Sequence, residues 1–161
     1  MKAPNDGFTL IEMVVIMAIV AILALLAIPS YQSKIVRGQV LEAGPLIDVA
    51  KKKIAAAWGD AHTLPLDNPS AELPAPEKMV SNVVGSVAVE AGAIHVTFGN
   101  RANNVLQGKV LTIRPAIVED APIVPVAWVC GYARVPDNMT AKGENRTNIP
   151  ANHLPLNCQA G

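Results

Sequence analysis

Residues 7–29 read GFTLIEMVVIMAIVAILALLAIP, an almost unbroken apolar run. Only Thr9 and Glu12 carry polar side chains among the 21 residues that start at Phe8. As an α-helix those residues would extend about 31 Å, close to the thickness of a bilayer's hydrocarbon core. An ionisable group inside such a run is costly, so the carboxylate of Glu12 is a functional-site hypothesis by default. The run therefore predicts a membrane-spanning helix with a functional carboxylate near its start.

Two other interpretations of this segment stay open. A secretory signal peptide would have a basic start, a shorter apolar stretch and small residues at a cleavage site behind it. Here Lys2 is the one basic residue before the run, and residues 24–28 form a poor cleavage site. A plain single-span anchor explains the length of the run but not Glu12, which an anchor would do better without.

The six residues GFTLIE, at positions 7–12, closely resemble the processing site of type IV prepilins. In that family a membrane peptidase cuts after the glycine, and the new N-terminal residue is N-methylated. The resemblance implies a cut between Gly7 and Phe8 and methylation of Phe8. It also implies that Glu12 guides the assembly of subunits into fibres.

The same resemblance implies an organisation in three parts. These are a leader peptide (1–7), a transmembrane or fibre-core helix (8–29) and a globular pilin domain (30–161). Residues 29–32 look like the continuation of the helix in that family, and the cysteine pair near the C-terminus, Cys130 and Cys158, is similar to the one that pilins carry.

The two cysteines, Cys130 and Cys158, lie 28 positions apart in a chain that is expected to reach an oxidising compartment. A disulfide is then the expected state. Two unpaired buried thiols are the alternative. In the chain-entropy model, closing a loop of this length stabilises the fold by about 3–4 kcal/mol.

Composition constrains the rest of the chain. The formal net charge is zero, so nothing overall points to nucleic acid or to anionic lipid. The 13 prolines and 11 glycines are concentrated after Trp58, which predicts a domain rich in turns. About a hundred residues lie beyond the helical part, which is enough for one small globular domain with its own core.

Past Pro29 the apolar residues recur at helical spacing. We therefore predict one long helix over residues 8–58, with Gly59 as its C-terminal stop. Pro29 and Pro45 each remove a helical hydrogen bond and should kink or loosen the helix. The residues expected to face the core are Val36, Val40, Ile47, Ala50, Ile54 and Trp58.

Residues 51–53 are three consecutive lysines close to the predicted end of this helix. Cations there would complement the negative end of the helix dipole. A patch that binds phosphate or DNA is the alternative interpretation.

The fold class predicted for the remainder is α+β, with a four-stranded antiparallel sheet covered by the second half of the helix. A proline-rich loop over residues 60–78 connects helix to sheet, and residues 133–161 should form an exposed loop closed by the disulfide. The predicted strands, from their alternation and the turns between them, are 83–90, 93–98, 109–118 and 124–132.

No enzyme site emerges from the sequence. The three histidines, His62, His95 and His153, are far apart and have no metal-ligand spacing with the cysteines. There is no phosphate loop and no nucleophile motif. We expect no cofactor, no metal and no catalytic activity.

The resemblance implies that the chain is a structural subunit, a major pilin that polymerises through its N-terminal helix into extracellular fibres for adhesion and twitching motility. A minor pilin that initiates fibres or binds DNA for uptake is one alternative. A pseudopilin of a type II secretion system is another.

Partners and location follow from the same resemblance. Expected partners are other copies of the subunit, the prepilin peptidase and methyltransferase, the inner-membrane assembly platform, and a host or surface receptor. The precursor is expected in the bacterial inner membrane and the assembled protein in the extracellular pilus. A DNA receptor should show a basic stripe, whereas the basic residues here are scattered among acids: Lys109, Arg114, Arg134, Lys142 and Arg146.

Overall fold

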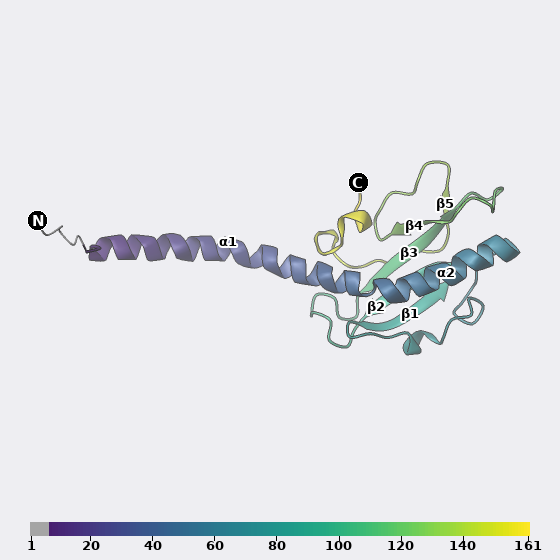
Figure 1. The fold of residues 1–161 in the computed structure, drawn as a ribbon, viewed down its shortest axis with the longest axis horizontal. Coiled ribbons are helices and arrows are strands. Elements are labelled where there is room, and N and C mark those ends of the chain that lie inside the picture. The colour runs from purple at the N-terminus through teal and green to yellow at the C-terminus, as the bar shows by residue number, and fades with distance from the viewer. Residues whose placement is uncertain (1–6) are drawn as a thin grey trace, which may run out of the picture. The chain divides into compact units, whose positions relative to one another are not determined.

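The computed structural model describes residues 7–161, apart from the side chains of residues 27–30. Most of the predicted leader therefore lies outside the described residues. The chain forms two compact units, Met1–Ile35 and Val36–Gly161, which are described separately. The first helix, α1 (Figure 1), runs over Leu10–Glu42 and so crosses the boundary between the units. It contains a stretch long and apolar enough to span a membrane, with a mean hydropathy of 3.0.

The long helix is interrupted once, at Ala43, before α2 continues over Gly44–Ala61. The amide of Ala43 donates to the carbonyl of Val40 at 3.3 Å, a shorter-range bond than the helix uses elsewhere. Pro45 stands in the first turn of α2, where its missing N–H leaves no helical bond unmade. The predicted weak point at Pro45 is thus confirmed as a break, whereas the weakening at Pro29 stays a prediction.

The prediction that Gly59 ends the helix is wrong, because α2 runs on to Ala61. His62 provides the stop instead: it adopts the left-handed conformation with φ at 55°, and its amide donates to the carbonyl of Trp58 at 3.0 Å. Gly59 keeps helical geometry, and a glycine ends a helix only where the backbone turns left-handed.

The lysine run does not lie at a helix end either, since α2 has no basic residue in its last turn. The dipole interpretation is therefore wrong. Lys53 instead pairs with Glu72 at 2.6 Å. The ammonium of Lys51 lies over the ring of Trp128, 5.7 Å from its centroid.

The sheet contains the four predicted strands in the order β1-β2-β3-β4, with every neighbouring pair antiparallel. Their bounds are β1 Val84–Glu90, β2 Ala93–Phe98, β3 Val110–Ile117 and β4 Ala127–Cys130. A two-residue strand that the sequence did not indicate, β5 Thr140–Ala141, pairs with β3. Ala91 and Gly92 join β1 to β2 with positive φ angles of 47° and 82°, the conformation that two-residue hairpins require.

β4 is shorter than predicted at both ends. Pro125 cannot donate to a ladder, and Gly131 leaves the extended conformation with φ at 55°. A Cβ atom on Gly131 would lie 2.8 Å from the carbonyl oxygen of Cys158, so the position requires glycine. The strand therefore ends where the disulfide begins.

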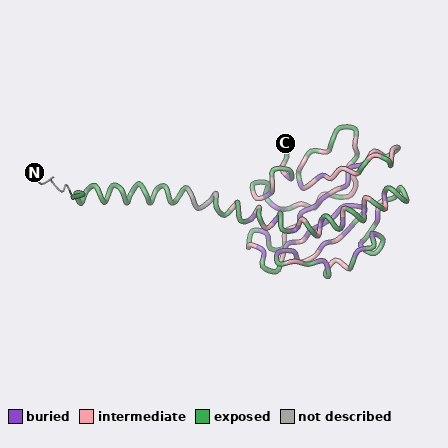
Figure 2. The backbone as a smooth tube through the Cα atoms, viewed as in Figure 1, coloured by how far each residue is buried: buried purple, intermediate pink, exposed green. Residues whose placement is uncertain are grey.

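Buried residues of both helices and of the sheet form one apolar cluster, and Figure 2 draws the buried residues in purple. The helical side contributes residues spaced three or four apart, as predicted, with Ala43 added at the break. The sheet contributes alternate residues of β1, β2 and β3. The largest fully buried side chains of the cluster include Val36, Ile54, Val87, Ile94, Val96, Phe98 and Leu111.

The loop between α2 and the sheet is held by one buried amide. Asn68 is 2% exposed. Its Nδ2 donates to the carbonyls of Pro74 and Val87, at 2.8 and 3.0 Å, and its Oδ1 accepts from the amide of Val89 at 2.7 Å. Asn68 thereby satisfies backbone groups on the outer edge of β1.

The C-terminal region is less exposed than predicted. Ile149 and Leu154 are fully buried and belong to the core cluster, and Cys158 is 3% exposed. Two short 3₁₀ helices, Ala151–His153 and Leu156–Cys158, shape this segment. Isolated core residues in an irregular segment leave no periodicity, which is why the alternation of the sequence could not reveal them.

Candidate functional site

The predicted processing residues lie together at the start of α1. Gly7, Phe8 and Thr9 precede the first helical turn, and Phe8 is 72% exposed. The Thr9 hydroxyl accepts from the amide of Glu12 at 3.3 Å, and the Glu12 carboxylate accepts from the amide of Thr9 at 3.4 Å. This reciprocal pair is a capping box, which satisfies two amides that a helix start would otherwise leave open.

Thr9 is a site residue that the sequence reasoning missed. The spacing Thr-x-x-Glu just before an apolar run is the recognised signal for a capping box, and it was available at positions 9–12. A carboxylate in the first helical turn also faces the positive end of the helix dipole. Thus Glu12 already has a partner within its own chain.

Beyond the capping box, the side chains of residues 13–26 are all exposed in the chain as described. Leu25 and Leu26, for example, are 69% and 71% exposed. None of the most apolar stretch of this helix is buried against the described part of the chain (Figure 2). A helix that is apolar on every side needs lipid or other helices around it. The described residues of the chain supply neither.

The predicted disulfide joins Cys130 to Cys158, with their Cα atoms 4.5 Å apart. It therefore fastens the end of β4 to the last 3₁₀ turn. The amide of Tyr132 donates to the carbonyl of Cys158 at 2.9 Å beside the bridge. These cysteines belong to the unit Val36–Gly161, whereas Gly7, Phe8 and Glu12 belong to the other.

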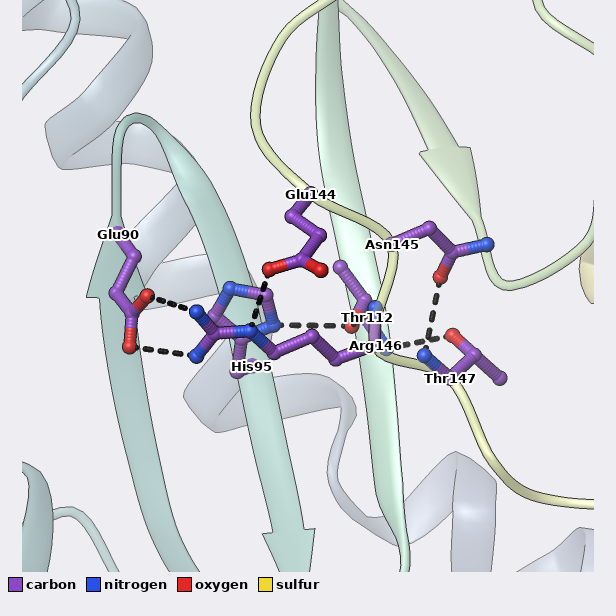
Figure 3. Close-up of polar contacts among 7 residues, drawn as sticks. All are labelled: Glu90, His95, Thr112, Glu144, Asn145, Arg146 and Thr147. Atoms are coloured by element: carbon purple, nitrogen blue, oxygen red, sulfur yellow. Dashed lines mark hydrogen bonds and ion pairs between the residues drawn. The ribbon is translucent and has the colours of Figure 1, made fainter.

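A polar cluster attaches the C-terminal segment to the sheet (Figure 3). The hydroxyl of Thr112, on β3, accepts from the amide of Arg146 at 3.0 Å and lies 2.9 Å from Nδ1 of His95 on β2. The guanidinium of Arg146 contacts Glu90 through both carboxylate oxygens, at 2.8 and 2.6 Å, and donates to Glu144 at 3.0 Å. Carboxylates on two different segments thus fix one arginine.

Burial and the neighbouring arginine act together on His95, which is 5% exposed. Desolvation, and then the positive charge of Arg146, hold the pKa of His95 below its ordinary value. The two carboxylates raise the pKa of Arg146. The sequence had suggested an ordinary sheet or surface histidine, and the cover that buries it comes from a segment about fifty residues away.

The described residues hold no group of three or more potential metal ligands. His62 ends α2 and His153 lies in a 3₁₀ helix, so neither joins His95. Three of the basic side chains named above are paired with acids: Arg134 with Asp137, Lys142 with Glu119, and Arg146 with Glu90 and Glu144.

These features define an anchored subunit with two unlike units. Its apolar helix has no partner among the described residues of its own chain, whereas Val36–Gly161 carries its own core, disulfide and polar attachments. Comparison with known proteins identifies the class. The family model described as Pilin (bacterial filament) matches residues 36–159, and that of the prokaryotic N-terminal methylation motif matches residues 3–28. The chain belongs to the pilin family of bacterial filaments.

Similar curated proteins cover nearly the whole chain. The type IV major pilin protein PilE1 of Neisseria gonorrhoeae is 33% identical over 165 residues, covering 99% of this chain and 89% of that protein. A fimbrial protein of Neisseria meningitidis serogroup A is 30% identical, with 99% and 96% covered. Fimbrial protein EcpC of Eikenella corrodens is also 30% identical, with 99% and 94% covered.

Membership of this family shows several properties of the chain. It is a structural protein and not an enzyme. It is anchored in the membrane as a precursor, is processed by a peptidase, and assembles with other pilins into extracellular pili.

Proposed function

We propose that this chain is the major subunit of a type IV pilus that serves adhesion and twitching motility. The observation that carries the proposal is the apolar helix of residues 10–26, whose side chains are exposed in the isolated chain. Burying them against other helices supplies cohesion at about 25 cal/mol per Å² of apolar surface. Relatives that cover nearly the whole chain and are named as major pilins support the same assignment.

The proposed maturation begins with a cut between Gly7 and Phe8, followed by N-methylation of Phe8. The leader is then residues 1–7, the fibre-core helix is 8–29, and the remainder is the globular pilin domain. The exposed, non-helical backbone at residues 7–9 supports the position of the cut, because a protease needs an accessible, extended substrate.

The cut creates an ammonium group next to the capping box. That ammonium lies one residue before Thr9, whose amide is 3.4 Å from the Glu12 carboxylate. A charged partner binds a carboxylate more strongly than a neutral amide does. Both charges are costly in lipid unless they are paired. We infer that Glu12 is held by its own chain until an ammonium replaces the Thr9 amide, and that the ammonium of a joining subunit is the partner that guides assembly.

The helix meets an apolar environment both in lipid and in the fibre core. A motor of the assembly platform can therefore move it between the two without unfolding Val36–Gly161, which supports reversible extension. Nucleic acid is not favoured as a partner, since Arg134, Lys142 and Arg146 are all paired with acids.

The first test is the intact mass and N-terminal sequence of protein sheared from the producing cells. An abundant chain that begins at methylated Phe8, two mass units below its reduced form, is expected. A processed chain present only in trace beside another dominant subunit would make it a minor pilin. A chain that still carries Met1 and stays in the membrane would refute both the cut and the fibre.

A further inference from the structure

The loop between β3 and β4 presents one apolar side chain to solvent. Ile123 is 93% exposed, so it contacts almost nothing in its own chain. Pro122 and Pro125 stand on either side of it and restrict the backbone. The amide of Val124 donates to the carbonyl of Ala121 at 2.9 Å, which closes the turn. We call this turn, residues 121–125, the Ile123 tip.

The base of the same loop is fixed from the side. Glu119 forms an ion pair with Lys142, in the segment that follows β5. The next residue, Asp120, is exposed and belongs to none of the ion pairs between the described residues. Because the two prolines and the hydrogen bond of the turn restrict its backbone, a partner that binds the tip pays less conformational entropy.

A groove lies on another part of the same unit, between the helices and β4. Its floor includes Ile47, Trp128 and the Cys130–Cys158 disulfide, and its volume is about 220 Å³. Lys51 and Asp48 line it too, and the ammonium of Lys51 lies over the ring of Trp128. Lys51 belongs to none of the ion pairs between the residues that the structure describes.

The tip and the groove are distinct surfaces of one subunit. The tip precedes β4, whereas the groove is lined by Trp128 and Cys130 within and at the end of that strand. Ile123 is not among the groove's lining residues, and its 93% exposure shows that it does not fill the groove of its own chain. One subunit thus offers an apolar projection with an acid beside it, and a recess of mixed apolar and polar lining that holds both a base, Lys51, and an acid, Asp48.

A filament of identical subunits needs a pair of surfaces of this kind. Contacts between the same patch on two subunits close into dimers, whereas contacts between two different patches continue without end. The tip offers an apolar side chain, and the groove contains apolar side chains that can receive it. Asp120 and Lys51 have opposite charges, and neither belongs to an ion pair between the described residues.

We propose that the Ile123 tip of one subunit docks into the groove of a second copy of this chain, with Asp120 facing Lys51 across the contact. This inference rests on the proposed function, since it names the surfaces through which the globular domains of neighbouring subunits meet in the pilus.

The direct test replaces Ile123 with a photo-crosslinking phenylalanine derivative in cells that produce pili. Sheared fibres are irradiated, and the crosslinked peptides are identified by mass spectrometry. Crosslinks to residues 40–51 or 128–130 of another copy are expected. Crosslinks confined to other segments, or monomers alone from intact fibres, would overturn the proposal.

A second test uses charge and matched controls. Asp120→Lys and Lys51→Glu should each lower the yield of sheared fibres, and the double variant should restore most of it, because the swapped pair again has opposite signs. Lys52→Glu, an exposed neighbour outside the groove, should behave like the parent. No rescue in the double variant would contradict the facing of these two residues.

The apolar part of the contact has its own control. Ile123→Asp should reduce fibre yield by about tenfold, as expected when a central apolar contact is lost. Leu66→Asp changes another exposed apolar residue, at 74% exposure, and should leave the yield unchanged. Single exposed apolar residues are common and usually carry no contact. An equal loss in both variants would therefore refute a specific role for Ile123.

The two proposals fail in different ways. If the parent chain forms no fibres, the proposed function is wrong. If it forms fibres whose yield ignores both charge reversals and Ile123→Asp, the pilus assignment stands and only the tip-and-groove contact is wrong.

Discussion

The first 20 described residues and the unit that starts at Val36 treat apolar side chains in opposite ways. Leu23, in the helix, is 60% exposed, while Ile54, in the second unit, is fully buried by its own chain. The second unit thus buries its apolar side chains by itself, whereas those of the helix can be buried only by lipid or by other subunits. Substitutions in the helix should therefore lower fibre yield, whereas substitutions in the core of the second unit should lower its free energy of unfolding. At the helix start, Glu12 forms hydrogen bonds with Thr9 of its own chain, and it is also the residue that we propose to pair with another subunit.

The largest effect is expected from Glu12→Ala. Fibre yield should fall by about tenfold or more, because a joining ammonium loses its carboxylate in an apolar surrounding. The variant should still be processed, and its disulfide should still form, since Cys130 and Cys158 belong to the other unit. Shear yield and the mass of the membrane-bound chain measure both. Glu42→Ala, at the exposed end of α1, is the control. Normal fibre yield from Glu12→Ala would remove the pairing argument.

The next largest effect is a difference in stability between a substitution in the core and one in the exposed helix. Ile54→Ala should lower the free energy of unfolding by about 3–4 kcal/mol, because it leaves a cavity in a fully buried site. Leu23→Ala should leave that free energy unchanged. Both tryptophans, Trp58 and Trp128, lie in the second unit, so denaturation of the full chain in detergent can be followed by their fluorescence. Equal destabilisation by the two variants would mean that the helix packs on the domain.

A smaller effect is expected at the capping box. Thr9→Ala removes the hydroxyl that accepts the Glu12 amide and should cost about 1 kcal/mol in helix-end stability, so that the first turn exchanges its amide protons about fivefold faster. Thr9→Ser keeps the hydroxyl and is the matched control. Hydrogen exchange of the full chain in detergent measures the difference, and unchanged exchange in Thr9→Ala would show that the box does not form.

The smallest expected effect is a pH dependence of the second unit. Because the folded state holds the pKa of His95 below its ordinary value, the unfolded chain binds more protons there. Stability should therefore be full above a pH of about 6.5, the usual pKa of histidine, and decline as the pH falls below it. His95→Gln should flatten this decline, while His62→Asn, at an exposed histidine, should not. An undiminished slope in His95→Gln would exclude His95 as its source.

Periodicity predicted the parts of the fold that repeat. The apolar spacing from Val36 to Trp58 identified the buried side of the helix, and alternation identified all four main strands. The motif at residues 7–12 likewise lies within the stretch that the family model of the N-terminal methylation motif matches, residues 3–28. These features depend on local sequence, because each residue faces the core for a reason that its near neighbours share.

Features that depend on distant partners were not predictable. His95 looks like an ordinary strand residue until Arg146 covers it, and Ile149 enters the core from an irregular segment. Local conformation also misled the prediction, at Gly59, because the left-handed turn of His62 ends the helix, and at the end of β4, because Gly131 leaves the extended conformation. The contact that we propose for Ile123 also requires a second copy, which one chain cannot display.

The buried amide of Asn68 has a consequence for a crowded polymer. Subunits in a filament are held at high local concentration, and an open sheet edge under such conditions invites strand-to-strand pairing between copies. Asn68 already occupies the carbonyl of Val87 and the amide of Val89 on that edge. Strand-to-strand pairing between copies is thereby disfavoured along this part of β1.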